Sequence, residues 1–408
     1  MTMTKKPLLF LLGAGFSLGA NIPRKGIDIN DICFQGYFIF PENGEKHYLN
    51  LGPDMMCYPI TTDFNYLAKE DREHLDFSKN YGPLNMHSDA TKRILKIIKH
   101  FLKEAEKAGI EKPNYEDVAD FIFRIYEQQQ KFPADKDPFI KHYIGTTAAN
   151  YLEDVAEGSG DILGASALLQ TSRNYISSVL KTFLGFPGEC EKVKWLTDIC
   201  RSSVTRVYTL NHDLLLEDMF KKHKVPHDNG FEEGEYWYYF HPRNYRDDSF
   251  CHIVKLHGSI NWRPTKAPEK YGDSKSGILG IPKEDSYSNP EPEILVGRKI
   301  KIETQHSGPQ LFLFTKFTSD LYQSNKIIVC GYSFNDEDIN SRLIEWMCSS
   351  LENKMVVIHG EPDKLHEDMR IHAIRERFWK RWLDSSRIHF IKKWAQDVKV
   401  EDLETFII

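Results

Sequence analysis

Residues 7–21, PLLFLLGAGFSLGAN, decide the fold of this chain because an uninterrupted apolar run leads directly into a glycine turn. Residues 8–12 show no polar alternation, which is typical of a strand covered by helices on both faces of a parallel sheet. Gly13 and Gly15 permit a sharp turn, and their N–H groups can approach a bound anion. From Ser17 onward the sequence predicts a helix whose N-terminus favours phosphate. The pattern is neither a full dinucleotide fingerprint nor a P-loop, so taken alone it predicts only a strand and a tight turn.

The composition is that of an ordinary globular protein, with 41% hydrophobic and 27% charged residues. A chain of 408 residues is long enough for a large core and for two or more lobes. The net charge of -6 argues against a general nucleic-acid-binding protein, although it leaves room for a local basic face. No apolar run is long enough to cross a bilayer and no signal-peptide pattern is present, so we expect a cytoplasmic location. The 7 scattered cysteines contain no C-x-x-C pair, which predicts reduced, mostly structural thiols and no zinc site.

Helical patterns dominate the middle of the chain. Residues 91–108 place Ile94, Ile97, Ile98 and Phe101 on one stripe, and Asn114 is the expected N-cap of a further helix. Residues 168–183 and 191–202 also have helical patterns, whereas 33–58 have no clear period. We therefore predict a mainly helical insertion or cap domain at residues 60–203, within a sheet domain made of residues 1–59 and 204–408.

From residue 206 onward, short apolar runs alternate with helical patterns, as a parallel sheet requires. The predicted strands are residues 207–210, 252–256, 327–330 and 355–358, and the predicted helices are 214–223, 310–323, 337–350 and 362–382. Residues 263–292 are rich in Pro, Gly, Ser and Lys and predict a long loop. The aromatic run at 236–240 predicts a buried or interface strand. Phe378 and Trp382 fall on one helical face, which predicts packing on the sheet.

Polar clusters follow three of the predicted strands, namely residues 209–213 (TLNHD), 256–259 (LHGS) and 331–336 (GYSFND). Open α/β sheets bind ligands at the carboxyl ends of their strands, so these clusters are candidates for a ligand site. Each cluster also has a structural explanation, because Asn and Asp cap helices and Gly-x-Ser makes turns. Asp213 is equally well explained as a substrate contact and as the cap of a helix that begins at Leu214.

Together with GAGFS at residues 13–17, these clusters resemble the sirtuin-like NAD-consuming proteins, in particular the bacterial SIR2-like NAD hydrolases of anti-phage defence. The four motifs occur in the order typical of that family and lie on both sides of the predicted insertion. The resemblance implies an α/β fold with a Rossmann-like, sirtuin-type parallel sheet. It also implies NAD as the substrate, without a metal.

The resemblance implies a role for each matching residue. Asn211 and Asp213 would hold the nicotinamide ribose and carboxamide side, and His257 would be the catalytic base. The glycine loop would face the NAD phosphates, and residues 331–333 would line the adenosine half. The full set of implied NAD-binding residues is Gly13, Ala14, Gly15, Phe16, Ser17, Thr209, Gly331 and Ser333.

These residue types suit cleavage of the bond between nicotinamide and ribose. That reaction develops oxocarbenium character, so it needs an ordered ribose and a group that takes a proton. Asn211 offers a neutral amide for hydrogen bonding, and His257 can accept a proton near neutral pH. The site requires that Gly15, Asn211 and His257 converge despite the long insertion between them.

The chain departs from protein-deacylating sirtuins in two respects. PRKG at residues 23–26 stands where those enzymes carry Pro-x-Phe-Arg, and no cysteine quartet for zinc is present. We therefore predict an NAD+ hydrolase that releases nicotinamide and ADP-ribose and depletes NAD during phage infection. The alternatives are a protein ADP-ribosyltransferase or deacylase, and a non-catalytic module that senses NAD or ADP-ribose. The resemblance also implies a homo-oligomer and a HerA-type ATPase or short Argonaute partner, with no direct nucleic-acid or membrane binding.

Overall fold

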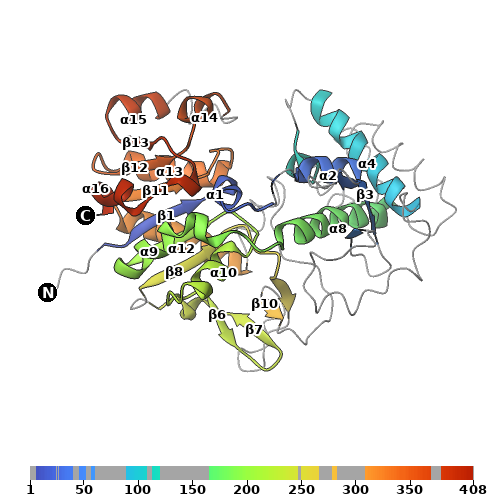
Figure 1. Cartoon of the computed structure of the whole chain (residues 1–408), viewed down its shortest axis with the longest axis horizontal. Helices are drawn as coiled ribbons and strands as arrows, with labels where there is room; N and C mark the ends of the chain where they lie inside the picture. Colours follow the sequence, from blue (N-terminus) through green and yellow to red (C-terminus); the bar gives the residue numbers. More distant parts are fainter. Residues whose placement is uncertain are drawn as a thin grey trace, which may run out of the picture. The chain divides into compact units, whose positions relative to one another are not determined.

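The chain forms two compact units. The computed structural model describes residues 6–23, 25, 27–39, 46–51, 57–59, 89–107, 113–119, 165–246, 250–265, 278–282, 308–368 and 378–407. The first unit, here called the sheet unit, consists of Met1–Arg24 and Leu184–Ile408, and the second unit consists of Lys25–Phe183 (Figure 1). The unit boundaries therefore differ from the domain boundaries predicted from the sequence, because residues 25–59 group with the second unit and residues 184–203 with the sheet unit.

A six-stranded parallel sheet forms the centre of the sheet unit. Its strands lie in the spatial order β13-β12-β11-β1-β5-β8. In chain order they are β1 (Leu8–Leu12), β5 (Thr205–Thr209), β8 (Cys251–Lys255), β11 (Lys326–Cys330), β12 (Lys354–Ile358) and β13 (Ile388–Ile391). Numbered within this sheet, that is the 3-2-1-4-5-6 order of the Rossmann fold. The predicted α/β fold with a Rossmann-like parallel sheet is confirmed.

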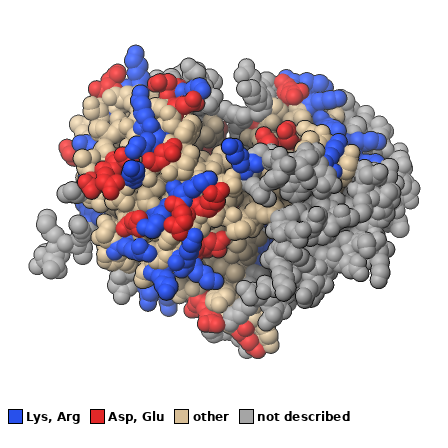
Figure 2. Space-filling view, viewed as in Figure 1, with Lys and Arg blue, Asp and Glu red and all other residues tan. Residues whose placement is uncertain are grey.

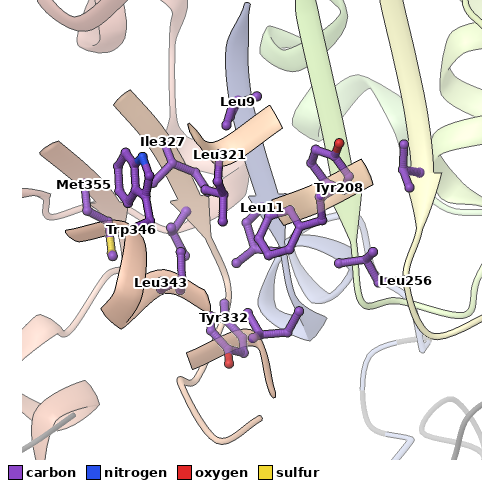
Figure 3. Close-up of a cluster of buried hydrophobic side chains, with 14 of the residues drawn as sticks. Leu9, Leu11, Tyr208, Leu256, Leu321, Ile327, Tyr332, Leu343, Trp346 and Met355 are labelled. Carbon is purple, nitrogen blue, oxygen red and sulfur yellow. The ribbon is translucent and has the colours of Figure 1, made fainter. Parts of the chain in front are cut away.

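Strand β1 lies between β11 and β5 in the interior of the sheet. All of its side chains are buried, on both faces of the sheet, as its unbroken apolar run predicted. Leu11 lies opposite Tyr208 of β5 and Val329 of β11. Leu9 and Leu11 belong to a buried apolar cluster that includes α12 (Gly308–Gln323) and α13 (Glu337–Ser349) (Figure 3). On the other face, the Phe10 ring lies 6.2 Å from that of Trp195, the first residue of α9 (Trp195–Ser202). Helices therefore cover both faces of the sheet.

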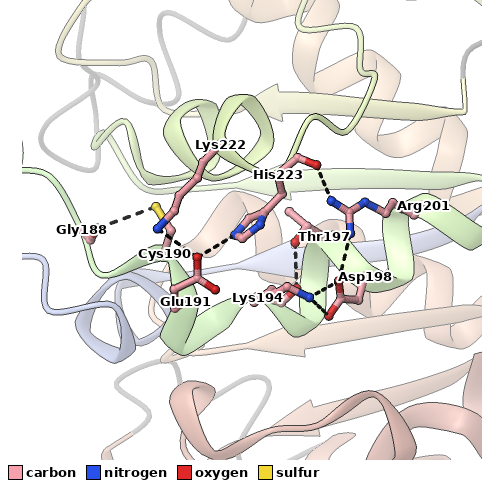
Figure 4. A network of polar contacts seen from close by, with 9 residues as sticks. All are labelled: Gly188, Cys190, Glu191, Lys194, Thr197, Asp198, Arg201, Lys222 and His223. Carbon is pink, nitrogen blue, oxygen red and sulfur yellow. Dashed lines mark hydrogen bonds and ion pairs between the residues drawn. The ribbon is translucent and has the colours of Figure 1, made fainter.

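A network of polar contacts lies on the outer side of α9 (Figure 4). It joins η2 (Cys190–Val193) and α9 to the end of α10 (Leu215–Lys222). Glu191 pairs with Lys222 at 2.9 Å, and Asp198 pairs with Lys194 at 2.6 Å. Exposed charges are screened by water, so these contacts contribute little to stability. Acidic and basic side chains are interspersed over the face of the sheet unit seen in Figure 2.

A smaller antiparallel sheet also belongs to the sheet unit. Its strand order is β6 (Phe231–Glu233), β7 (Trp237–Phe240), β10 (Ile278–Pro282) and β9 (Arg263–Thr265). The long loop predicted at 263–292 is therefore wrong at β9 and β10. Strand β9 pairs with β10, which also pairs with β7, and local periodicity does not reveal such pairing. Strand β7 was predicted, but Tyr238 is 38% exposed, so the strand is only partly buried.

The last part of the sheet unit packs aromatic side chains on the main sheet. Helices α14 (Pro362–Asp368) and α15 (Lys380–Asp384) coincide with the two ends of the helix predicted at 362–382, and residues 369–377 lie outside the described part of the chain. The Phe378 and Trp382 rings stack at 5.4 Å, and Trp382 is buried, which confirms their predicted packing. Three short helices follow β13, namely η6 (Ala395–Asp397), η7 (Val400–Leu403) and α16 (Glu404–Ile407).

Helices make up most of the described residues of the second unit. They include α2 (Ile29–Gln35), α4 (Asp89–Lys107), α8 (Ala165–Leu184) and a helix that is described at residues 115–119. Helix α4 buries the predicted stripe that includes Ile97 and Ile98. The Asn114 side chain accepts the N–H groups of Glu116 and Asp117, so the predicted N-cap is confirmed. A three-stranded antiparallel sheet is formed by β2 (Tyr37–Ile39), β3 (Lys46–Leu51) and β4 (Cys57–Pro59), in a stretch where no clear period predicted an element.

Two further expectations concern the chain as a whole. Within the described ranges, no helix is long and apolar enough to cross a membrane. Six cysteines have described side chains; all six are free thiols and five of them are buried.

Candidate active site

The candidate site lies at the carboxyl edge of the main sheet. The motifs at residues 13–17, 209–213, 256–259 and 331–336 begin at the ends of β1, β5, β8 and β11 respectively, and parallel strands place these ends on one edge (Figure 1). The strand order reverses between β1 and β11. Open α/β sheets bind ligands at such a reversal, so the glycine loop after β1 and the loop after β11 flank the expected position.

Glycines bring these two loops into backbone contact. The Gly13 N–H donates to the Cys330 carbonyl oxygen at 3.0 Å, and the Gly15 N–H donates to that of Gly331 at 2.9 Å. A Cβ atom at Gly13 would lie 2.6 Å from the Gly331 oxygen, and one at Gly15 would lie 2.7 Å from the Gly331 Cα. The Gly13 and Gly15 N–H groups are therefore bonded within the protein, and glycine is required here for the close approach of the two loops.

Helix α1 (Ala14–Gly19) begins before the position that the sequence indicated. The predicted start was Ser17, but Gly13 takes the N-cap position with an extended backbone, so the helix begins at Ala14 and ends after 6 residues. Phe16 is buried, with its ring 6.0 Å from that of Trp195, and Ser17 is also buried. Ala14 is exposed, and its N–H forms no hydrogen bond with a described residue. Ala14 is thus the accessible member of the loop.

Asn211 connects the loop after β5 to the glycine loop. Its Nδ2 donates to the Gly13 carbonyl oxygen at 2.9 Å and to Ser17 Oγ at 2.7 Å. Its backbone N–H donates to Oγ1 of the buried Thr209 at 3.1 Å. These contacts use both amide protons and fix the side chain. Its Oδ1 accepts no hydrogen bond from the described part of the chain, so this atom is the acceptor that Asn211 can offer.

Asp213 is buried and has protein partners for both carboxylate oxygens. Ser17 Oγ donates to Oδ2 at 2.6 Å, and the N–H of Leu215, the first residue of α10, donates to Oδ1 at 3.0 Å. Burial raises the pKa of Asp213, while the nearby Lys255 ammonium opposes this shift. The hydrogen bond to the Leu215 N–H lies at the start of α10, as expected if Asp213 stabilises the beginning of this helix.

Lys255 is a residue that the sequence analysis overlooked. It lies at the end of β8 with 3% of its surface exposed, and its ammonium donates to Glu217 at 3.0 Å, to Ser259 at 2.8 Å and to the Asp213 carbonyl oxygen. The lysine therefore joins the TLNHD and LHGS motifs to α10. A single lysine in the apolar run HIVKL was the available signal, because a charge in a buried strand needs a partner.

His257 lies among these loops and is itself buried, with 3% of its surface exposed. Its ring centroid is 6.3 Å from that of His212 and 6.4 Å from that of Phe314 on α12. Its Nε2 lies 3.2 Å from Oδ2 of Asp336, the N-cap of α13. Asp336 belongs to the GYSFND motif, but the motif alone did not indicate a role for it.

The structure thus brings the four motifs together at one edge of the sheet unit. Gly15 contacts Gly331, and Asn211 contacts Gly13. His257 lies close to Asp336, and its ring is near that of His212. Ser333 is exposed and Gly331 is partly exposed. Among the described residues, no group of three or more His, Cys, Asp or Glu side chains is arranged to hold a metal ion.

Comparison with known proteins bears on the same part of the chain. No curated protein matches the sequence significantly. Among solved structures, a mutant Sir2 homologue in complex with ADP ribose is 11% identical over 68% of this chain and 80% of its own, with a TM-score of 0.30. A triple mutant of Sir2 homologues in complex with 2'-O-acetyl ADP ribose is 10% identical over 74% of this chain and 87% of its own, with a TM-score of 0.29. Residues 205–383, which contain three of the four motifs, match the family model of the SIR2-like domain.

Proposed function

We propose that this chain is an NAD+ glycohydrolase, which cleaves the bond between nicotinamide and ribose with water as the acceptor. The observation that carries the proposal is the meeting of the glycine loop, Asn211 and the loop of His257 where the strand order of a Rossmann-type sheet reverses. The match of residues 205–383 to the SIR2-like domain supports NAD-dependent chemistry.

In the proposed reaction, NAD+ and water give nicotinamide, ADP-ribose and a proton. The electron pair of the glycosidic bond leaves with nicotinamide, and water adds to the anomeric carbon. Asn211 accepts a hydrogen bond from a ribose hydroxyl through Oδ1, because its two amide protons are already bonded to Gly13 and Ser17. His257 takes the proton that the attacking water loses.

We divide the remaining residues of the site into two groups. The accessible Ala14, Gly331 and Ser333 are assigned to the nucleotide half of NAD. The others are assigned a supporting role. They allow the two glycine-containing loops to pack closely, or they hold Asn211 and the start of α10 in place. These are Gly13, Gly15, Phe16, Ser17, Thr209 and Asp213.

We extend the proposal to the biological role on the resemblance of the four motifs to anti-phage NAD hydrolases. In this role the enzyme depletes cytoplasmic NAD during infection and acts as a homo-oligomer, with a HerA-type ATPase or a short Argonaute as its partner. The helical domain proposed at residues 60–203 serves as a cap or assembly surface. NAD measured in infected cells that carry the wild-type gene or a His257→Ala gene tests this extension.

The enzymatic proposal is tested by incubating purified protein with NAD and separating the products, both for the chain alone and for its assemblies with candidate partners. We expect equal amounts of nicotinamide and ADP-ribose from the wild-type protein. His257→Ala should lower kcat by about 100-fold or more, because positioned proton transfer contributes that much. Asn211→Ala should also lower kcat, because the ribose is then no longer held in the reactive geometry. His223→Gln, a histidine of the surface network outside the site, is the matched control and should retain full activity.

Four outcomes would contradict the proposal. One is the absence of nicotinamide release from every assembled form, and another is full activity in the Asn211→Ala and His257→Ala variants. Incorporation of label from NAD into protein would instead indicate ADP-ribosyl transfer. Tight binding of NAD by calorimetry without turnover would indicate a sensing module.

A further inference from the structure

We propose that Asp213 is a positioning residue for Asn211 and acts through the Ser17 hydroxyl. It accepts hydrogen bonds at both carboxylate oxygens, and so anchors a chain of donors that leaves Asn211 Oδ1 as the atom presented to the substrate. This inference rests on the proposed function, since it gives Asp213 a task in the same reaction without contact with NAD.

Two short hydrogen bonds connect the three side chains. Asn211 Nδ2 donates to Ser17 Oγ at 2.7 Å, and Ser17 Oγ donates to Asp213 Oδ2 at 2.6 Å. Ser17 and Asp213 are only 3% and 5% exposed, whereas Asn211 is partly exposed. The chain therefore runs from the accessible amide into the interior, where hydrogen bonds are stronger because the effective dielectric constant is lower.

The direction of the chain is set at the Asn211 end. An amide nitrogen only donates and a backbone carbonyl oxygen only accepts, so the hydrogen bond of 2.9 Å to the Gly13 carbonyl oxygen turns Nδ2 toward the glycine loop. The second amide proton is donated to Ser17 Oγ. The Ser17 hydroxyl accepts there, so its own proton is available for Asp213 Oδ2.

The Asp213 end requires the same direction. The Leu215 N–H can only donate, so Oδ1 is its acceptor at 3.0 Å. With Oδ2 accepting from Ser17, both oxygens are acceptors, as in an ionised carboxylate. Burial raises the pKa of Asp213, and the charge of the Lys255 ammonium, which donates to the Asp213 carbonyl oxygen, opposes this rise.

The start of α10 alone does not account for an aspartate at position 213. Asn and Ser accept N–H groups at helix starts about as well as Asp does. An Asn side chain, however, has one acceptor oxygen and one NH2 group. If its oxygen accepts the Leu215 N–H, the NH2 group faces the Ser17 hydroxyl, and the reverse orientation places the NH2 group against the Leu215 N–H. Only the carboxylate serves both donors.

The charge of Asp213 also affects the atom that the site offers. Hydrogen bonds in a chain polarise one another, so a hydroxyl that donates to a carboxylate becomes a better acceptor. Ser17 Oγ then binds the Asn211 amide proton more strongly. An amide whose protons are strongly bonded is in turn a better acceptor at its oxygen, which is the atom proposed to order the ribose.

Two nearly isosteric variants interrupt the chain at different points. Asp213→Asn and Ser17→Ala should each lower kcat by about 10- to 100-fold, the factor that corresponds to a hydrogen bond with a charged group. KM for NAD should change less, because neither side chain contacts NAD in this proposal. Asp218→Asn is the matched control, since Asp218 is an exposed acidic residue in the first turn of the same helix, and it should retain full kcat.

A double-mutant cycle tests whether Asp213 acts through Ser17. In a Ser17→Ala background, Asp213→Asn should cause little further loss of kcat, because the connection to Asn211 is already broken. A carboxylate in direct contact with NAD would instead give losses that multiply and a higher KM in both backgrounds. A carboxylate that served only the start of α10 would leave Asp213→Asn with full kcat. Either of these patterns, in variants that tryptophan fluorescence shows to be folded, would overturn the inference.

Hydrogen exchange of the Asn211 side-chain amide reads the chain directly and needs no turnover. It is followed by NMR of protein labelled with nitrogen-15 at asparagine, and the Asn211 signals are assigned by their disappearance in Asn211→Ala. We expect slow exchange of both protons in the wild-type protein and in Asp218→Asn, and exchange of one proton that is faster by about 10-fold or more in Ser17→Ala and Asp213→Asn.

Exchange at the wild-type rate in both chain variants would overturn the inference. Absence of NAD hydrolysis by the wild-type protein would instead count against the proposed function, while the exchange rates still decide whether Asp213 holds Asn211.

Discussion

Replacing Gly331 with alanine tests whether the contact between the two glycine-containing loops supports the fold. Gly331 has φ of +65°, and a Cβ atom there would lie 2.2 Å from the Phe16 nitrogen and 2.4 Å from the Gly15 carbonyl carbon. Both neighbours are backbone atoms of the loop and helix that follow β1, so they have no flexible side chain that could move aside. The two loops must therefore separate to admit the methyl group.

The expected cost has two parts. A left-handed backbone conformation costs a residue other than glycine about 1–2 kcal/mol. An extra methyl group in a well-packed region typically costs about 1–3 kcal/mol through displaced neighbours. We therefore expect Gly331→Ala to lower the free energy of unfolding of the sheet unit by about 2–5 kcal/mol.

The tryptophans provide a selective assay for this unit. All 7 tryptophans lie between Trp195 and Trp394, within the sheet unit, so urea denaturation followed by tryptophan fluorescence reports the unfolding of that unit alone. Ser333→Ala is the matched control, because Ser333 is an exposed residue of the same loop and such substitutions usually change stability by less than about 0.5 kcal/mol. A loss below about 1 kcal/mol in Gly331→Ala would refute the reasoning, since it is smaller than the usual cost of overpacking.

The same assay applies to two buried charged or titratable groups of the sheet unit. Lys255→Met should cost about 3–5 kcal/mol, because it leaves the partly buried Glu217 carboxylate without its cation, and the double variant with Glu217→Gln should recover part of this loss. No recovery in the double variant would contradict the pairing. Burial lowers the pKa of His252 from 6.5 to about 4, so the unfolded chain binds its proton first as the pH falls, and stability should decrease between pH 6.5 and 4 by up to about 3 kcal/mol. His252→Gln should flatten this part of the stability curve measured by urea denaturation at several pH values, whereas an unchanged slope would show that other groups cause it.

The main sheet was largely predictable because its strands are marked by local pattern. Parallel strands buried on both faces are continuous apolar runs, and the predictions at β1, β5, β8, β11 and β12 agree with the structure to within two residues. Strand β13, with the sequence IHFI, was missed because it is short and only partly buried at three of its four positions. Strands β9 and β10 were missed because they form by pairing with each other and, for β10, with β7, and their own sequences carry little apolar alternation.

The position of the site was predictable from the same physics, but its internal contacts were not. Once the strands are parallel, the polar clusters that follow them must share one edge, which is why four motifs separated by up to 318 positions meet. Nothing in local sequence indicates that Ser17 is buried and bonded to Asp213, because the two residues are 196 positions apart. The role of Lys255 is likewise set by tertiary contacts with Glu217 and Ser259.

The glycine loop also shows why a motif does not reveal which property of glycine the fold uses. A glycine after a strand can expose its N–H to an anion, or it can let another backbone approach closely. In this chain the Gly13 and Gly15 N–H groups are bonded to carbonyl oxygens of residues 330 and 331, and Gly331 supplies the left-handed turn that completes the contact. The Gly13 carbonyl oxygen accepts a hydrogen bond from Nδ2 of Asn211. The loop therefore acts on the proposed chemistry mainly by fixing the amide that orders the ribose, so its glycines matter to the reaction even where they touch no phosphate.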